Sequence, residues 1–152
     1  MKKDVTVREY TDDDFEGLIE LYKDSNTYGG SYDASRDTRD KLQATADDLC
    51  LFVAATDSEV VGSVMILDNP HSFWLQRFCL SGSLSDELKA DVSKLLLETT
   101  ELIARSRDHE SILVYTDPEN KDLRARYIQL DFTKGNEYSC FWKPVKDDQR
   151  EA

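Results

Sequence analysis

The order of apolar segments along the chain predicts a layered α/β (or α+β) domain with a mixed central sheet of about seven strands and about four helices. Short apolar or alternating segments, which predict strands, are interrupted by stretches with helical periodicity, in the order β-α-α-β-β-β-α-β-α-β-β. The 152 residues correspond to one domain, and 39% of them are hydrophobic, which is enough for a sizeable core. No repeat or linker divides the sequence. We therefore expect one domain over residues 5–144, followed by a polar tail over residues 145–152.

The first elements are a strand and a helix. Val5 and Val7 alternate with polar residues, which predicts a strand. Thr11 then reads as a helix N-cap, with Asp14 three residues later in the position of a capping box. The expected apolar face of this helix consists of Phe15, Leu18, Ile19 and Tyr22. The polar residues 31–48 predict a loop and a short second helix.

The middle of the chain predicts three strands and a long helix. Residues 49–55 and 60–67 form a hairpin around the turn at 56–59, and a strand rich in aromatic residues follows over 72–80. A helix over 86–107 leads to a further strand, and this succession predicts a parallel crossover. The further strand is expected at residues 111–115. The expected buried stripe of the long helix consists of Leu88, Val92, Leu95, Leu96, Thr99, Leu102 and Ile103.

The last part of the chain predicts a helix and two closing strands. The helix follows the turn at 117–120 and buries Leu123, Tyr127 and Leu130. The closing strands are expected at 132–134 and 138–143.

Charge and cysteine usage exclude several classes of protein. The formal net charge is −12, so no basic surplus is available to bind a nucleic-acid backbone or an anionic membrane surface. The longest apolar run, Leu49–Ala55, is far shorter than a membrane-spanning helix. Cys50, Cys79 and Cys140 lie in apolar stretches without CxxC spacing, which indicates reduced core thiols in a cytoplasmic protein. With only two histidines, no metal site is expected.

Several strings are similar to those of the GNAT superfamily of acyl-CoA-dependent N-acyltransferases. In DPENKDLRARYIQLDF (117–132), Asn120, Tyr127 and Phe132 match the family's NPxN…A…LYxxLGF pattern, while Asp131 replaces its usual glycine. SEVVGSVMIL (58–67) and YSCFWKPV (138–145) resemble the family's hairpin and final strand. The resemblance covers about residues 5–144. It implies a GNAT-like mixed sheet that is mostly antiparallel.

The resemblance implies transfer of an acetyl group from acetyl-CoA to a primary amine on a small molecule or a protein. The residues implied in the site are Tyr127 as the general acid, Phe78, Cys79, Leu80, Lys89 and Asn120 for the cofactor, and Tyr28 and Tyr32 for the acceptor. Two of these have simpler interpretations: Tyr127 is also at core spacing, and Asn120 is first an N-cap. A homodimer is left open.

The region expected to bind the cofactor's pyrophosphate departs from the family pattern. Residues 81–92 contain one glycine, Gly82, and neither Arg nor Gln, whereas Asp86, Glu87 and Asp91 lie where phosphates would bind. Lys89 is the only cation there. This degenerate loop supports an alternative function, an inactive GNAT-fold binding or regulatory module that has lost acetyl-CoA. A third reading is an acidic mimic of nucleic acid that binds a basic protein.

No general base is evident from the sequence. The strand FWLQRFCLS has Gln76 and Arg77 where a carboxylate would serve, so Asp68 or a water chain is the substitute. Cys79 is interpreted as a buried structural thiol and His71 as a surface residue. The acidic stretch 33–48 is interpreted as a solvated face.

Overall fold

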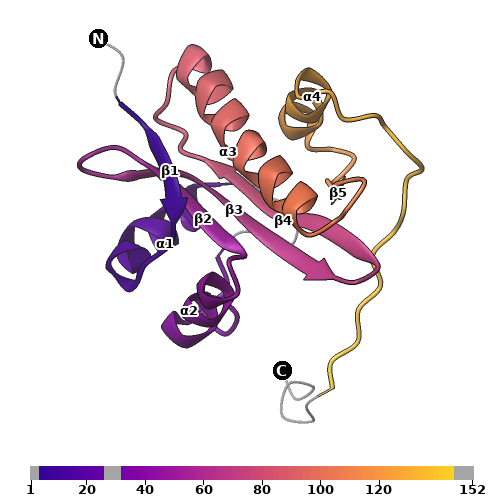
Figure 1. The fold of residues 1–152 in the computed structure, drawn as a ribbon, viewed down its shortest axis with the longest axis horizontal. Helices are drawn as coiled ribbons and strands as arrows, with labels where there is room; N and C mark the ends of the chain where they lie inside the picture. The colour runs from indigo at the N-terminus through magenta and orange to yellow at the C-terminus, as the bar shows by residue number, and fades with distance from the viewer. Residues whose placement is uncertain (1–3, 26–31, 146–152) are drawn as a thin grey trace.

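The computed structural model describes residues 4–25 and 32–145, which form one mixed sheet with helices on both faces (Figure 1). Its elements in chain order are β1 (Thr6–Glu9), the 3₁₀ helix η1 (Asp12–Asp14), α1 (Phe15–Asp24), α2 (Arg39–Asp47), β2 (Leu51–Ala55), β3 (Val60–Asn69), β4 (Ser72–Leu80), α3 (Asp86–Ser106), β5 (Leu113–Val114) and α4 (Lys121–Gln129). This order matches the sequence prediction up to α4. The mixed α/β fold class is confirmed.

The sheet contains five strands in the order β1-β2-β3-β4-β5. Neighbouring strands are antiparallel except β4 and β5, which are parallel and joined through α3, as the crossover predicted. The expected closing strands at 132–134 and 138–143 are wrong for the described chain. After α4 the chain runs away from the sheet (Figure 1), so these residues have no neighbouring strand with which to form a ladder.

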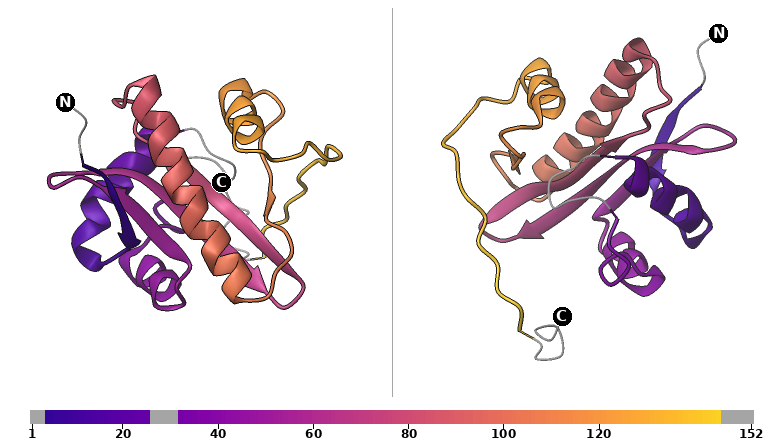
Figure 2. Two further views of the ribbon diagram at one scale, coloured as in Figure 1. Left: turned by 45° about the horizontal axis from the view of Figure 1, so that its top comes forward. Right: turned by 180° about the vertical axis from the view of Figure 1, so that it is seen from behind.

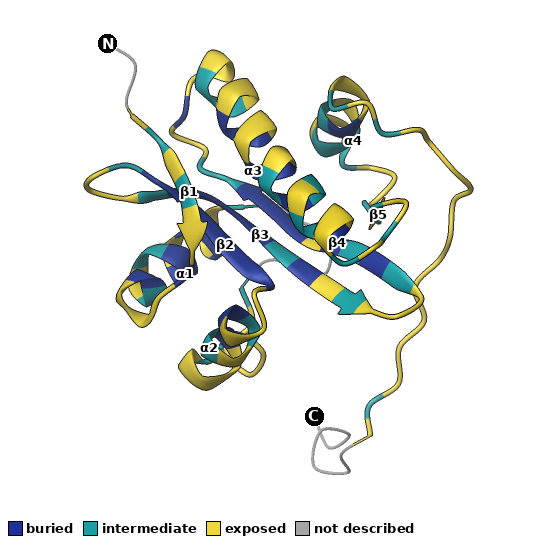
Figure 3. Cartoon of the chain, in the orientation of Figure 1, coloured by how far each residue is buried: buried dark blue, intermediate teal, exposed yellow. Residues whose placement is uncertain are grey.

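An apolar cluster packs on each face of the sheet. Figure 2 shows α1 and α2 on one face and α3 and α4 on the other. Phe52, Val64 and Phe78 face α3 and α4, whereas Leu51 and Val53 face α1 and α2. Every residue of β2 is buried, as Figure 3 shows for the centre of the sheet. The core therefore lies over β2, β3 and β4.

The turn between β1 and α1 has the predicted capping geometry. The Asp14 carboxylate accepts a hydrogen bond from the backbone N–H of Thr11 at 2.9 Å. It also accepts two from the Arg8 guanidinium at 2.7 and 2.9 Å, and these lower the pKa of the carboxyl against the effect of burial, which raises it. This anchored carboxylate fixes where the first helix begins.

The long helix α3 is rotated from the expected orientation. Ser85 caps it by accepting from the N–H of Leu88 at 3.2 Å. The predicted core residues Leu95 and Leu102 are 38% and 66% exposed, and the polar Ser93 and Thr100 are buried instead. Their hydroxyls donate to carbonyl oxygens one turn earlier in the helix, so both can lie on the core face without an unsatisfied group.

The cysteines divide into two kinds. Cys50 and Cys79 are buried free thiols, as expected, whereas Cys140 is exposed. The prediction for Cys140 is wrong because its segment does not pack as a strand. No helix in the described part of the chain is both long enough and apolar enough to cross a membrane.

Candidate functional site

The site is built around an irregularity in β4. Met65 pairs with Arg77 and Ile66 pairs with Leu75, so Gln76 is an extra residue that forms a bulge. β5 pairs with β4 only at residues 74 and 75. Among the described residues, no strand pairs with that side of β4 over residues 76–80. We call this stretch the open edge of β4.

The backbone groups at the open edge come from alternate residues. The N–H of Ser81 donates to the carbonyl oxygen of Val61 on β3 at 2.8 Å, so by the alternation of a strand Cys79 also faces β3. Phe78 and Leu80 then direct their N–H and C=O groups to the open edge. The Leu80 carbonyl accepts from the hydroxyl of Ser25 at 3.4 Å. Cys79 differs from the other two, because its backbone faces β3 and its side chain lies in the α1–α2 core.

Tyr127 of α4 lies against this edge. Its ring packs edge-on against Phe78, with centroids 5.9 Å apart, and against Phe132, with centroids 5.2 Å apart. The side chain is 5% exposed, and this burial raises the pKa of its phenol. The hydroxyl therefore keeps its proton at neutral pH. The interpretation of Tyr127 as a core residue is confirmed, and its ring packs on Phe78 of the open edge, while its role as a general acid stays a prediction.

Both ends of α4 are formed by residues of the segment 117–132, which resembles the family pattern. Asn120 is its N-cap and accepts from the N–H of Leu123 at 3.2 Å, as predicted. Asp131 has φ of 67°, the left-handed conformation expected from the family's glycine. The N–H of Phe132 donates to the carbonyl of Tyr127 at 3.0 Å. This termination folds Phe132 back onto the Tyr127 ring.

The turn between β4 and α3, residues 81–85, binds an anionic oxygen of the protein itself. The N–H of Gly82 donates to the carboxylate of Asp24, at the end of α1, at 3.1 Å. The N–H groups of Ser83 and Leu84 are bonded to the hydroxyl and carbonyl oxygens of Ser81. The turn can thus receive an anion, and a carboxylate now occupies its glycine N–H. Asp24 was missed in the sequence because 58 residues separate it from Gly82.

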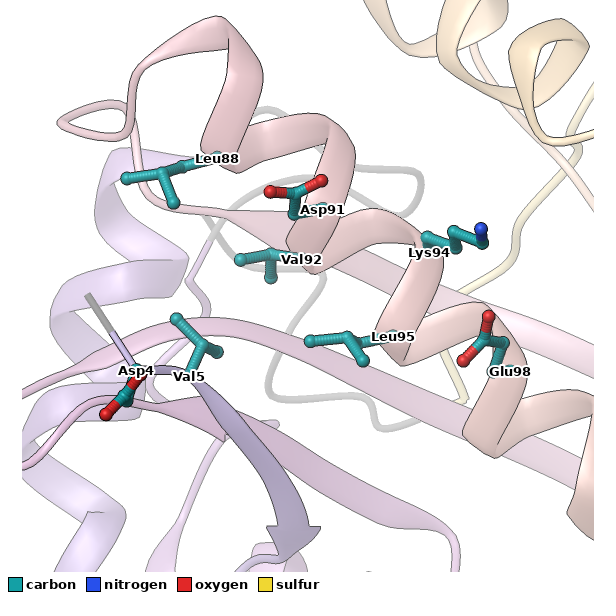
Figure 4. A pocket seen from close by; sticks show the side chains of 8 residues that line it. All are labelled: Asp4, Val5, Leu88, Asp91, Val92, Lys94, Leu95 and Glu98. Carbon is teal, nitrogen blue, oxygen red and sulfur yellow. The ribbon is translucent and has the colours of Figure 1, made fainter. Parts of the chain in front are cut away.

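The three acidic residues of the segment 81–92 lie in α3 and do not contact the N–H of Gly82. Asp86 and Glu87 are exposed in the first turn of α3. Asp91 lines a hollow of about 420 Å³ between α3 and β1, as Figure 4 shows. Lys89 is half-buried and lies one helical turn before the buried Ser93. None of the three carboxylates replaces Asp24 at Gly82.

On the opposite face of β4, Arg77 forms a buried ion pair. Its guanidinium donates to both carboxylate oxygens of Asp37 at 2.9 and 3.3 Å and lies 4.4 Å from the Tyr22 ring centroid. Arg77 and Asp37 are 4% and 2% exposed. They line a second hollow of about 370 Å³ that reaches the bulge at Gln76. The interpretation of residues 33–48 as a solvated face is therefore wrong for Asp37.

Asp68, the substitute for a general base, lies away from the open edge. It pairs with Phe73 at the beginning of β4, and its carboxylate binds Arg107 at 2.8 Å and His109 at 2.7 Å. These hydrogen bonds lower the pKa of Asp68 against the effect of burial, which raises it. The carboxylate thus ties the end of α3 to β3. His71 is exposed, as predicted.

Of the two expected acceptor residues, one can be placed. Tyr32 is half-buried, and the ammonium of Lys23 lies 5.2 Å from its ring centroid. The Tyr32 ring therefore already makes a cation–π contact within the chain. Tyr28 lies outside the described residues.

An aromatic stack unforeseen in the sequence lies where β4 and β5 diverge. The Trp74 and Tyr115 ring centroids are 4.7 Å apart, and the Tyr115 and Tyr138 centroids are 6.0 Å apart. The stack joins β4, the residue after β5, and the segment after α4. To predict this stack one would need the β4–β5 register, which the sequence does not reveal.

No protein-family model and no curated protein matches this sequence. Solved structures do. The PaiA N-acetyltransferase from Thermoplasma acidophilum, in complex with coenzyme A, superposes with a TM-score of 0.71 at 20% identity, over 84% of this chain and 88% of that one. AAC(6')-Iy with a CoA-linked bisubstrate analogue gives a TM-score of 0.73 at 16% identity, over 93% and 99%. The ribosomal-protein-S18-alanine N-acetyltransferase from Escherichia coli gives 0.66 at 10% identity, over 88% and 80%.

This chain has the GNAT fold. The fold expected from the segment at 117–132 is confirmed, with five strands in the described part of the chain in place of about seven. At these identities the likeness concerns the fold, and the chemistry has to be argued from this chain's residues.

Proposed function

We propose that this GNAT-fold chain transfers an acetyl group from acetyl-CoA to a primary amine. The observation that carries the proposal is the open edge of β4 beside the buried, protonated Tyr127. An unpaired strand edge binds an extended amide chain through backbone hydrogen bonds. The pantetheine arm of acetyl-CoA is such a chain. A cytoplasmic location stays a prediction.

The donor is held by groups along the open edge and at the beginning of α3. The N–H and C=O groups of Phe78 and Leu80 would bind the pantetheine arm. The turn at Gly82 fits a phosphate, because its N–H already binds an anionic oxygen. Lys89 would supply a positive charge one turn into α3, and Asn120, at the beginning of α4, would be a further contact for the donor. Cys79 contributes through packing alone.

Acetyl-CoA supplies the acetyl group as a thioester: the amine nitrogen bonds to the carbonyl carbon, the C–S bond breaks, and the amine gives up a proton as the sulfur gains one. Tyr127 holds a proton near the leaving sulfur. Because burial raises the pKa of its phenol well above the value of about 8.5 for a thiol, the hydroxyl acts mainly by hydrogen bonding to the sulfur as negative charge develops there.

The acceptor is proposed to be an amine that approaches beside Tyr32. An amine substrate carries an ammonium group at neutral pH and loses one proton to solvent before its nitrogen attacks; the Tyr32 ring already lies beside such an ammonium, that of Lys23. Two of the matched structures are an aminoglycoside N-acetyltransferase and a ribosomal-protein-S18-alanine N-acetyltransferase. Either class, a small molecule or a protein, is compatible with the site.

The rival function is a GNAT-fold binding module that does not use acetyl-CoA. It is favoured by one contact, the Asp24 carboxylate on the N–H of Gly82, since a phosphate must displace that carboxylate. It is also favoured by the ion pairs that occupy Asp68 and Asp37, which leave no identified base near the open edge among residues 4–25 and 32–145. Donor binding therefore decides between the two functions.

The test is calorimetric titration with acetyl-CoA and with CoA at low and moderate salt. We expect a dissociation constant in the micromolar range, about −8 kcal/mol. Asp24→Asn removes the competing charge and should tighten binding by about threefold to tenfold, which corresponds to about 1 kcal/mol. Asp13→Asn, the same change at an exposed site in η1, should leave the affinity unchanged. If millimolar acetyl-CoA produces no heat of binding and no thermal shift, either in the protein or in Asp24→Asn, the proposal is overturned.

A further inference from the structure

One hollow of the molecule has a positively charged lining in an acidic chain. It has a volume of about 370 Å³ and lies beside the bulge at Gln76, on the face of the sheet that α1 and α2 cover in Figure 2. Its charged side chains are Arg36, Asp37, Lys41 and Arg77, three cations against one carboxylate. The whole chain has 31 acidic and 19 basic residues, so the balance in the hollow is the reverse of the average. Cations gathered in a concave surface attract an anion.

The carboxylate in the lining is already bonded within the protein. Asp37 accepts hydrogen bonds from the Arg77 guanidinium at 2.9 and 3.3 Å and from the backbone N–H of Asp33 at 2.9 Å. It therefore neutralises Arg77 and leaves the other two cations to determine the sign of the hollow. The Asp33 carboxylate accepts from the N–H and the hydroxyl of Ser35 at 2.9 and 2.7 Å, and it does not line the hollow.

Lys41 supplies the charge on which a ligand would depend most. It is exposed on α2, and its ammonium donates to the carbonyl oxygen of Ser35 at 3.0 Å. A carbonyl is a neutral partner, and within residues 4–25 and 32–145 this ammonium forms no ion pair. Arg36, also exposed, adds a second cation to the lining. An anion can therefore pair with Lys41 without displacing a carboxylate of the described chain.

The rest of the lining suits the body of a small organic molecule. Leu42, Ala44 and Met65 are apolar, and Thr45 and Gln76 add polar groups without charge. The volume is within the range of small-molecule sites, which are mostly apolar and have a few polar groups that fix the orientation of the ligand. A molecule with an aliphatic body and an anionic group matches this lining.

The hollow adjoins the place where the amine is proposed to react. Gln76, the extra residue of the β4 bulge, lines the hollow and begins the open edge of β4. The hydrogen bond from the N–H of Asp33 to Asp37 fixes the chain directly after Tyr32 to the wall of the hollow. The Tyr32 ring already lies 5.2 Å from an ammonium. One small molecule that carries both charges can therefore use both features.

We propose that the acceptor is an amine that also carries a carboxylate, and that this carboxylate binds in the hollow as the partner of Lys41. The role of the amine rests on the proposed function, whereas the binding of a carboxylate in the hollow does not. The ammonium end of the acceptor lies toward Tyr32 and the open edge, and the carboxylate end lies toward α2. The acceptor class is thus narrowed to molecules that resemble amino acids, and charge selects among amines of similar shape.

The test is calorimetric titration, without acetyl-CoA, of linear amino carboxylates in which three to six methylene groups separate the amine from the carboxylate. Each is compared with its primary amide, which keeps the amine and the chain but removes the negative charge. At low salt we expect the chain length that fits to bind with a millimolar dissociation constant, about tenfold more tightly than its amide. No binding of any carboxylate, or equal binding of carboxylate and amide, overturns the inference.

The matching variant removes the charge from the hollow. Lys41→Ala should weaken binding of the carboxylate by about tenfold and leave binding of the amide unchanged. Because Lys41 is exposed, the variant should keep the circular dichroism of the folded chain. The control Lys94→Ala removes the same charge from an exposed site on α3, on the other face of the sheet, and should leave both affinities unchanged. Carboxylate binding that persists at full strength in Lys41→Ala overturns the inference.

The results distinguish a failure of this inference from a failure of the proposed function. If the carboxylates bind as expected and acetyl-CoA does not, the hollow is a carboxylate site and acetyl transfer is overturned. If acetyl-CoA binds and the carboxylates do not, acetyl transfer stands and the carboxylate-bearing acceptor is overturned.

Discussion

Two regions of this chain differ in how many of their side chains are buried. In the packed sheet region, β1 to α3, every residue of β2 is buried and α3 buries six residues. In the C-terminal region after α3, β5 is two residues long and α4 fully buries only Tyr127. The candidate site lies where the two regions meet, at Phe78 and Tyr127. Stability is thus concentrated in the first region, while the second places the ring of Tyr127 on Phe78.

The largest expected effect is on the packed sheet region. Arg77→Ala would leave the Asp37 carboxylate buried without its partner and should lower the free energy of unfolding by about 3–5 kcal/mol. Urea unfolding followed by circular dichroism measures this. Arg105→Ala, in an exposed pair with Glu101, should cost less than about 0.5 kcal/mol. Equal losses in the two variants would contradict the difference drawn between buried and exposed pairs.

The second prediction concerns the contribution of the C-terminal region. Tyr127→Phe keeps the ring that packs on Phe78 and removes the hydroxyl, so unfolding should change little while kcat for acetyl transfer falls about 100-fold. Release of the free thiol from acetyl-CoA, with an excess of a reactive amine, measures kcat. Tyr138→Phe, the same change on an exposed ring, is the matched control. An unchanged kcat in Tyr127→Phe would leave this residue a packing role only.

The sequence predicted the packed sheet region better than the C-terminal region, for a physical reason. Alternation and helical spacing report which faces are apolar, and they placed β1 to α4 within a few residues. The same residues at 138–143 predicted a strand, yet strand formation also needs a neighbouring strand, and in the described chain this segment lies away from the sheet. Local propensity could not reveal that.

The candidate site was predictable where it depends on local signals. Asn120 and Asp131 act at helix ends, and their roles follow from the residues around them. The contacts of Asp24 with Gly82 and of Asp37 with Arg77 join residues 58 and 40 positions apart. Nothing in a single sequence distinguishes these two aspartates from the other acidic residues of a strongly acidic chain.

A smaller effect is expected at the junction of the two regions, where Asp68 binds Arg107 and His109. Since its partners lower the pKa of Asp68 in the folded protein, its contribution to stability is present above the unfolded value of about 3.9 and is lost as pH falls through the folded pKa. Asp68→Asn should therefore cost about 1–2 kcal/mol at pH 7 and little at pH 2.5.

Unfolding of both proteins by urea between pH 2.5 and pH 7 measures this difference. Asp57→Asn, at an exposed turn in the β2–β3 hairpin, controls for the change in net charge. A difference between Asp68→Asn and the original protein that stays constant with pH would show that the carboxylate acts by shape and not by charge.

The smallest expected effect lies within the C-terminal region. Asp131 has φ of 67°, a conformation that costs an L-residue more than glycine, so Asp131→Gly should stabilise the end of α4 by about 0.5–1 kcal/mol. Asp131→Ala, which has a Cβ but no polar group to bond locally, should destabilise it. Because α4 is held mainly by Tyr127, we expect the change in amide hydrogen exchange within α4 and not in β2. Equal shifts in both elements would mean that the two regions unfold as one unit, and the contrast between them would then be one of packing density alone.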